Sequence, residues 1–305
     1  MNYKFGIILV NFNNARDTID CINSILKNDY KNFKIFVVDN STDEIPINTI
    51  KTFLIKNNVS FSEHNTNTAI SLIRTKNSGF AAANNMVLKQ ENTDVDFYWI
   101  LNNDTIISSD FLTVLNTKLI NEKEKVFTRI YSNTLLYYGT NIIQAVGGRV
   151  NFITGIPTHC HSLEKYNSTK KYSQKIDYPI GASIILHKQV VSKIGLMCEK
   201  YFLYYEELDW MEVAKKKNIS LKIFTDIAIN HREGSTTGNK KGKSFTQLYY
   251  SNRSRLIWIK KYHTKFYLFG QLISVLIYLK NINKFKGSEN SAYLKSIFNQ
   301  DECLF

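Results

Sequence analysis

Short, continuous apolar runs alternate with amphipathic segments over residues 5–121, and this alternation restricts the fold more than any other feature. The run Phe5–Val10 has no charged or hydrophilic side chain, as is typical of a strand that is buried on both faces. Residues 15–27 then place Ile19, Ile22 and Leu26 on one face of a helix. The first unit of the chain is therefore predicted to be a strand followed by a helix.

The same order repeats along the first part of the chain. We expect further strands at 35–38, 70–73 and 97–101, and helices at 45–57, 79–90 and 110–121. This order predicts an α/β fold with a Rossmann-like, mainly parallel central sheet flanked by helices. Ligands of such sheets bind beyond the carboxyl ends of the strands. At those ends the sequence has Asn11 and Asn13, Asp39 and Asn40, and Asn102–Asp104, so we expect a ligand site there.

The later part of the chain is less regular. Residues 126–178 are interrupted by Gly139, Gly147, Gly148 and Gly155, which suggest turns between short strands. A strand is expected at 180–187, a helix at 206–217 and a strand at 221–224. From Ser244 onward the chain is expected to be helical and is rich in Tyr, Arg and Lys. We therefore predict a nucleotide-binding domain at 1–243 and a basic, amphipathic helical extension at 244–305.

Composition and charge narrow the class of protein. The apolar share is 44% and the net charge is +13, which favours a folded chain with an anionic partner: nucleotide phosphates, anionic lipid or nucleic acid. We expect neither a signal peptide nor a membrane span, because no apolar run reaches about 18 residues. The four cysteines fit no metal-binding spacing and are expected to be reduced thiols of a cytosolic protein: Cys21, Cys160, Cys198 and Cys303.

Two of the strand ends carry an aspartate, and each aspartate can have either a functional or a structural role. Asp39 can accept a hydrogen bond from the imide N–H of uracil or thymine, or it can be a turn residue in Asp-Asn-Ser-Thr. Asp104 can bind Mg²⁺ or Mn²⁺ through oxygen, or it can belong to a turn that ends the strand.

Two later sites have the same ambiguity. The acids Glu206, Glu207 and Asp209 open a predicted helix, where the helix dipole favours negative charge. Three acids exceed that need, so one of them can be a general base. His231 can be structural, or a metal ligand through neutral imidazole.

A family resemblance is carried by several segments in a fixed order: Ile8–Asn13, Val37–Ser41, Asn77–Asn85, Leu101–Thr105, Ile180–Ser183, Phe202–Trp210, His231 and Tyr249–Arg253. Together they resemble the family 2 inverting glycosyltransferases with a GT-A fold, and within it the rhamnosyltransferase-like bacterial subset of surface-polysaccharide synthesis. The resemblance spans about residues 5–260. Two positions depart from the usual pattern, because Asn102 replaces the first acid of the metal motif and Glu207 stands where aspartate is common.

The resemblance implies a role for each matching residue. Glu207 is implied as the catalytic base, and Asp104 and His231 as the metal site. The nucleotide and donor site is implied to comprise Val10, Asn11, Asn13, Asp39, Asn40, Asn77, Gly79, Phe80, Asn84, Asn102 and Asn103. The acceptor side is implied to comprise Gly181, Ala182, Glu206, Asp209 and Trp210.

The implied function is transfer of a sugar, with inversion and a Mg²⁺ or Mn²⁺ ion, from dTDP-rhamnose or a UDP-sugar to a saccharide or lipid-linked glycan acceptor. Such an enzyme is of the hexosyltransferase type and serves capsule, O-antigen or related surface-glycan synthesis. We expect a cytoplasmic protein whose basic C-terminal helices either pack on the main domain or lie peripherally on the inner face of the membrane.

Three alternatives compete with this interpretation. A non-catalytic nucleotide-sugar or glycan-binding relative is disfavoured because Asp104, Glu207 and His231 are all present. A nucleic-acid-binding protein is suggested by charge alone, but zinc-knuckle spacing and the aromatic signature of an RNA-binding sheet are lacking. A sugar nucleotidyltransferase needs a glycine-rich loop after the first strand, and residues 11–16 contain no glycine.

Overall fold

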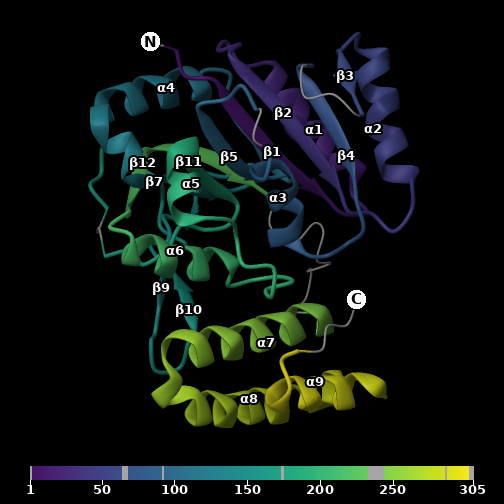
Figure 1. The fold of residues 1–305 in the computed structure, drawn as a ribbon, viewed down its shortest axis with the longest axis vertical. Helices are drawn as coiled ribbons and strands as arrows, with labels where there is room; N and C mark the ends of the chain where they lie inside the picture. The colour runs from purple at the N-terminus through teal and green to yellow at the C-terminus, as the bar shows by residue number, and fades with distance from the viewer. Residues whose placement is uncertain are drawn as a thin grey trace.

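The computed structural model describes residues 2–63, 68–90, 93–172, 175–232, 244–285 and 287–301, and shows a layered α/β domain above a layer of helices (Figure 1). The strands are β1 (Phe5–Asn11), β2 (Phe33–Asp39), β3 (Phe61–Ser62), β4 (Ile70–Arg74), β5 (Phe97–Asn102), β6 (Thr105–Ile106), β7 (Arg129–Tyr137), β8 (Ile143–Ala145), β9 (Gly148–Val150), β10 (Pro157–His159), β11 (Ser183–His187) and β12 (Ser220–His231). The helices are α1 (Ala15–Leu26), α2 (Ile45–Lys56), α3 (Phe80–Leu88), α4 (Phe111–Glu122), α5 (Lys188–Ile194), α6 (Glu206–Lys216), α7 (Phe245–Tyr262), α8 (Tyr267–Asn281) and α9 (Ser288–Phe298). Short 3₁₀ turns are η1 (Lys123–Phe127), η2 (Thr264–Phe266) and η3 (Ile282–Lys284).

The main sheet has the strand order β3-β4-β2-β1-β5-β11-β7-β12-β6. Its first five strands run parallel, as the alternation of strands and helices predicts. β11 then pairs antiparallel with both β5 and β7, and β12 returns parallel to β7. The carboxyl ends of β1, β2, β4 and β5 consequently meet at one edge, and β11 begins at that same edge.

Helices cover the sheet on both faces because each strand is apolar on both. In β1, Ile7 and Leu9 belong to the core cluster that α1, α2 and α4 cover, whereas Ile8 belongs to the cluster that α3, α5 and α6 cover. All three side chains are fully buried. This two-sided burial is what the continuous apolar run predicts, and it fixes the strand ends relative to both layers.

The second half of the sheet differs in detail from the expectation. β12 extends to His231 instead of ending near residue 224, with a bulge between Phe224 and Ala228. The short strand β6 follows Asp104 and pairs antiparallel with the end of β12. Thr105 thereby lies opposite His231. Isolated sequence patterns do not predict a two-residue strand, because its pairing partner is more than 120 residues away.

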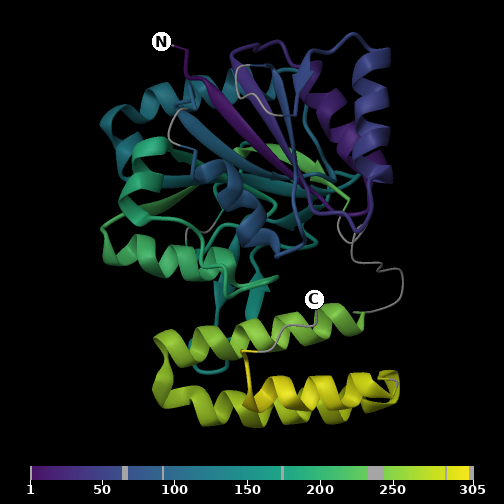
Figure 2. The same ribbon diagram turned by 45° about the vertical axis from the view of Figure 1, so that its right-hand side comes forward.

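The three C-terminal helices form a separate layer in which α7 lies next to the α/β domain and α8 and α9 lie farther out (Figures 1 and 2). α7 is anchored by the Arg253 guanidinium, 3.0 Å from the Lys200 carbonyl oxygen, and by the Ser254 hydroxyl, 2.8 Å from that of Leu203. Trp258 of α7 is fully buried in the same core cluster as α3, α5 and α6. The predicted domain boundary at residue 243 lies outside the described residues.

No helix in the described ranges is both long and apolar enough to cross a bilayer. Cys21, Cys160 and Cys198 are free thiols, and Cys303 lies outside the described residues.

Candidate active site

The sheet register places the predicted site residues side by side at the carboxyl edge. Asn11 at the end of β1 lies opposite Asp39 at the end of β2. On the other side of β1, Val10 lies opposite Asn102 at the end of β5. The backbone N–H of Asn102 donates to the backbone carbonyl oxygen of Ala182, just before β11, at 3.0 Å. The edge therefore unites residues from four segments that span 170 positions of the chain.

Asp39 is the centre of a buried hydrogen-bond cluster. Its Oδ1 accepts from the Asn11 amide at 2.7 Å and from the Ser41 hydroxyl at 2.6 Å. Its Oδ2 accepts from the Arg74 guanidinium at 2.8 Å. A carboxylate has about four lone-pair directions, so Oδ2 keeps one for a ligand donor such as an imide N–H. Ser41 and Arg74 belong to this cluster, and the sequence interpretation did not include them.

A polar relay joins this cluster to the end of β5. The Thr18 hydroxyl on α1 donates to the Asn11 amide oxygen at 2.7 Å, and the Asn103 amide donates to Thr18 at 2.8 Å. Asn103 thus connects the end of β5, through Thr18, to Asn11 at the end of β1. Asn13 has a positive φ of 54°, and its side-chain oxygen accepts from the backbone N–H of Thr42 at 3.0 Å.

Two asparagine oxygens at the edge lack partners among the described residues. The amide oxygens of Asn40 and Asn84 are buried without a hydrogen bond. Asn84 uses its amide group to donate to the Phe80 carbonyl oxygen at 2.9 Å, so its oxygen points elsewhere. A buried acceptor without a partner costs stability, which is a typical mark of a group that a ligand satisfies.

The segment from Asn77 to Phe80 connects the donor side to the segment that precedes α6. The backbone N–H of Phe80 donates to the Phe202 carbonyl oxygen at 2.9 Å. Gly79 has φ 95° and ψ 173°, a conformation that essentially only glycine adopts. A Cβ at Gly79 would lie 2.3 Å from the Phe202 carbonyl oxygen, which is a backbone atom and cannot rotate away as a side chain can. The Asn77 side chain accepts from the Gly79 N–H at 3.3 Å.

We expect Gly79→Ala to destabilise the protein by about 2–4 kcal/mol, because backbone strain and a backbone clash add together. Gly139→Ala is the matched control. Gly139 has φ 70° but open space around its Cβ position, so only backbone strain of about 1 kcal/mol applies. Urea unfolding of both variants measures the difference. Equal losses for the two variants would show that the contact with Phe202 contributes nothing.

Asp104 and His231 form a buried pair at the end of β5 and β12. The Nε2 of His231 lies 3.0 Å from Oδ1 of Asp104 and 3.3 Å from the Asn102 amide. The Nδ1 of His231 lies 2.7 Å from the side-chain oxygen of Gln144, which is 2% exposed. Because the side-chain oxygen of Gln144 can only accept, the Nδ1 of His231 carries a hydrogen and donates it to Gln144. Nε2 is the ring nitrogen that faces Asp104. Gln144 on β8 is a third residue that the sequence interpretation did not include.

The chemistry of this pair suits a divalent cation. A carboxylate oxygen and an imidazole nitrogen are accepted ligands of Mn²⁺, and the orienting bond from Gln144 is the usual outer partner of a metal-binding histidine. The described residues contain no group of three or more His, Cys, Asp and Glu side chains suited to a metal. The chain therefore offers two such ligands here, and a bound diphosphate would have to complete the coordination.

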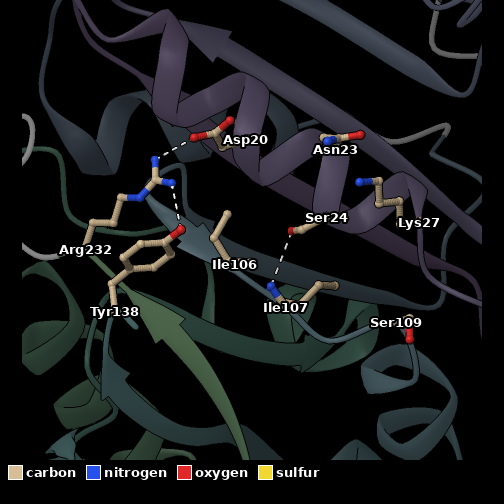
Figure 3. A pocket seen from close by; sticks show the side chains of 9 residues that line it. All are labelled: Asp20, Asn23, Ser24, Lys27, Ile106, Ile107, Ser109, Tyr138 and Arg232. Carbon is tan, nitrogen blue, oxygen red and sulfur yellow. Dashed lines mark hydrogen bonds and ion pairs between the residues drawn. The ribbon is translucent and has the colours of Figure 1, made fainter. Parts of the chain in front are cut away.

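A pocket of about 360 Å³ lies between α1, β6 and Arg232, the residue directly after β12 (Figure 3). Arg232 lies at one side of it and donates to Asp20 at 2.7 Å and to the Tyr138 hydroxyl at 3.2 Å. Arg232 also forms an ion pair with Asp17, and these partners raise its pKa, although burial opposes that change. The backbone N–H of Arg232 donates to the Asp104 carbonyl oxygen at 3.0 Å, so Arg232 links the segment that carries Asp104 to α1.

Glu206 and Glu207 open α6 after two residues in the left-handed region, Tyr204 and Tyr205, with φ 67° and 70°. One carboxylate oxygen of each glutamate is buried without a hydrogen bond in the described chain. Burial raises the pKa of Glu207 to about 7. Burial, and then the Glu207 charge, raise the pKa of Glu206 well above its ordinary value. A carboxyl with a pKa near 7 is suited to general base catalysis at neutral pH.

Asp209 and Trp210, predicted on the acceptor side, point into the protein instead. Asp209 accepts from Tyr201 and Tyr262 at 3.0 Å each and from Lys261 at 2.6 Å, which attaches α6 to α7. The Trp210 indole N–H donates to the Gly195 carbonyl oxygen at 2.9 Å. Both side chains are almost fully buried.

Comparison with known proteins adds a family match and a set of structural neighbours. Residues 6–137 match the model described as Glycosyl transferase family 2. A crystal structure of S. aureus TarS matches with TM-score 0.52 and 16% identity, covering 84% of this chain and 39% of that one. This chain thus spans about two fifths of the length of that TarS chain.

Two further neighbours were solved with ligands. S. aureus TarS 1–349 in complex with UDP-GlcNAc matches with TM-score 0.51 and 16% identity, over 84% of this chain and 66% of that one. GalNAc-T7 with UDP, GalNAc and Mn²⁺ matches with TM-score 0.61 and 13% identity, over 87% and 50% of the two chains. The chain has the GT-A α/β fold with a helical C-terminal region, and its residues 6–137 match glycosyl transferase family 2.

Proposed function

We propose that the protein is an inverting glycosyltransferase that moves a hexose from a nucleoside diphosphate to a saccharide acceptor. The observation that carries the proposal is the shared sheet edge. Asp39 and its partners lie beside β1, and Asp104 with His231 lies beyond β5. A nucleotide base at Asp39 would place its diphosphate toward Asp104, in the arrangement expected for ligands at the carboxyl edge of such a sheet. The match of residues 6–137 supports this assignment.

The residues of the proposed donor site fall into groups according to the part of the donor that each can bind. Val10, Asn11, Asp39 and Asn40 surround the base, and the free lone-pair direction on Asp39 accepts the imide N–H of a pyrimidine. The unpaired oxygen of Asn84 faces the sugar or its phosphates. Asp104 and His231 would hold Mn²⁺ or Mg²⁺, which would offset the negative charge of the departing diphosphate. UDP is supported as the nucleotide by the UDP complexes of the structural neighbours.

Glu207 acts as the general base. It removes the proton from an acceptor hydroxyl, whose oxygen forms a new bond to the anomeric carbon as the bond to the phosphate oxygen breaks. The nucleoside diphosphate leaves on the opposite face, so the anomeric configuration inverts. Gly181 and Ala182, which lie beside Asn102 at the same edge, form a wall for the acceptor. Glu206 supports Glu207, and Asp209 and Trp210 hold α6 in place.

The subset resemblance gives dTDP-rhamnose as the second donor to test, with a surface glycan or its lipid-linked precursor as acceptor. Both assignments rest on the motifs of the chain. The negative charge of the diphosphate is opposite to the net charge of the chain, which is +13.

Thermal stabilisation tests the proposal directly. We expect UDP or dTDP with Mn²⁺ to raise Tm, because a ligand that binds only the folded state stabilises by about 2.7 kcal/mol at 100 times its Kd. GDP and CMP with Mn²⁺ are the controls, since guanine and cytosine present a different hydrogen-bond pattern to Asp39. A shift with none of the four nucleotides, or an equal shift with all of them, would contradict a uracil- or thymine-specific donor site.

A further inference from the structure

The outer face of α8 exposes a row of large aliphatic side chains. Leu268, Leu272, Leu276 and Leu279 are between 52% and 79% exposed, and Phe269 beside them is 45% exposed. Their spacing of three and four residues places them along one side of the helix. The opposite side of α8 carries Gly270, Ser274 and Tyr278, which are buried against the rest of the helical layer. We call the exposed row the α8 leucine face.

The α8 leucine face is held outward by buried contacts. The Arg255 guanidinium of α7, itself 3% exposed, donates to the Gly270 carbonyl oxygen at 3.1 Å and to the Ser274 hydroxyl at 2.6 Å. A Cβ at Gly270 would lie 2.9 Å from Ile259 of α7, so the two helices are in close contact. α8 lies on the far side of α7 from the sheet in both views (Figures 1 and 2). Rotation of α8 that buried its leucines would break these contacts.

A second exposed apolar segment adjoins the first turns of α8. The loop between β9 and β10 exposes Phe152, Ile153 and Ile156 by 40–47%. Arg255 donates to the Thr154 carbonyl oxygen of this loop at 2.7 Å, and Gly155 packs against Ile259, the residue that also contacts Gly270. The loop and α8 are therefore anchored to the same two residues of α7. Four exposed leucines along one side of a helix exceed the scattered exposed residues of an ordinary surface.

The charged residues of α8 and of the segments directly before and after it in the sequence are basic. Lys265 precedes α8 and Lys280 is in its last turn, and both are exposed. The sequence has no Asp or Glu from Ser244 to Ser288, whereas it has eight Lys and Arg in that stretch: Arg253, Arg255, Lys260, Lys261, Lys265, Lys280, Lys284 and Lys286. An occupant of the α8 leucine face must therefore tolerate apolar side chains at its centre and lysines at both ends.

We propose that the α8 leucine face docks on an anionic lipid bilayer, with α8 lying in the plane of the interface. Apolar side chains between basic ones are the pattern by which amphipathic helices bind such surfaces. A second copy of the chain fits less well. Antiparallel pairing of two α8 helices would bring Lys265 of one copy near Lys280 of the other, and parallel pairing would bring each lysine near its equivalent. This surface is independent of the sugar-transfer site and goes beyond it.

Vesicle sedimentation tests the docking surface. We expect the full chain to sediment with vesicles of phosphatidylcholine and phosphatidylglycerol, and at least tenfold less with phosphatidylcholine alone. Leu272→Glu with Leu276→Glu should lower binding to the anionic vesicles at least tenfold, because two charges would enter the apolar layer. Lys265→Glu with Lys280→Glu should lower it by about fivefold or more for each lysine.

The matched control is Ile45→Glu with Ile55→Glu on α2, two isoleucines that are 72% and 65% exposed on another part of the molecule. This pair adds the same charge and should leave vesicle binding unchanged. Unfolding curves like that of the wild type establish that the double variants are folded. Equal losses in the α2 and α8 variants would overturn the proposal. So would the absence of vesicle binding together with a dimer, seen by sedimentation velocity, that Leu272→Glu with Leu276→Glu dissociates.

Discussion

Glu207→Gln is expected to lower kcat for sugar transfer by about 10²- to 10⁴-fold while leaving nucleotide binding intact. The carboxyl is the proposed acceptor of the hydroxyl proton, and glutamine keeps its shape but cannot take the proton. One Glu207 carboxylate oxygen is buried without a partner in the described chain, so the amide breaks no hydrogen bond there. The measurement is steady-state transfer with the donor that gives turnover, beside the Tm shift caused by the same nucleotide.

The pH dependence gives a second test of the same group. Burial raises the pKa of Glu207 to about 7, and only the ionised form is a base. The transfer rate of the wild type should therefore rise with pH up to about 7 and level off above it. The Glu207→Gln variant should lack this rise.

The stability of the protein should respond in the opposite direction. A carboxyl with a raised pKa binds more protons in the folded state than in the unfolded state, between the ordinary value of 4.5 and about 7. Stability contributed by the protonated form is thus lost as pH rises through that window. Glu207→Gln, which cannot ionise, should be at least as stable as the wild type at pH 8.

Glu206→Gln is the matched control for the catalytic role. It removes the neighbouring buried carboxyl, whereas the pKa of Glu207 is raised by its own burial, which this substitution leaves in place. We expect this variant to retain transfer with the same dependence on pH as the wild type. Near-normal transfer by Glu207→Gln, or loss of transfer only in Glu206→Gln, would show that Glu207 is not the general base.

The strands and their ends could be predicted from sequence because their signals are local. β1, β2 and β5 are unbroken apolar runs, and burial on both faces requires only such runs. Once these strands are parallel, their carboxyl ends must share an edge. Asn11, Asp39 and Asn102 therefore come together for a reason that the sequence contains.

The partners of these residues could not be predicted, because their contacts join distant positions. Gln144 orients His231 across 87 positions, and Arg232 reaches Asp17 across 215. Gln144 follows no strand end, and Arg232 follows the end of β12 but lies well beyond the strand that the sequence predicts at 221–224. Gln144 sits within a three-residue strand, β8, and a glutamine there carries no signal of its partner.

The helix α6 shows a different limit of sequence reasoning. Glu206, Glu207, Asp209 and Trp210 form one motif in the sequence, but a helix turns about 100° per residue and sends its side chains in different directions. Asp209 and Trp210 consequently enter the core, whereas one oxygen of Glu207 remains without a partner in the described chain. A shared motif predicts shared location on a helix, but not a shared face.

Asp104→Asn should abolish the dependence on metal and lower transfer at least about 10³-fold, the largest effect we expect from a change outside the base. Loss of a residue that merely orients a metal ligand typically lowers affinity 10- to 100-fold, so loss of a ligand should lower Mn²⁺ affinity by more than about 100-fold. Asparagine keeps the size of the side chain, and Gln144 still holds His231. Mn²⁺ binding in the presence of UDP, followed by electron paramagnetic resonance, measures the loss without any need for turnover.

Asp20→Asn is the control that separates a metal ligand from a nearby acid. Asp20 pairs with Arg232, the residue directly after His231, at 2.7 Å, so its substitution makes the same chemical change beside the same strand end. Because Asp17 also pairs with Arg232, the strand should keep its place and Mn²⁺ affinity should stay within a few fold of the wild type. If Asp20→Asn and Asp104→Asn weaken Mn²⁺ binding equally, the effect comes from the charge of the region. If neither does, Asp104 and His231 form a structural pair, and a cationic side chain must offset the diphosphate charge instead.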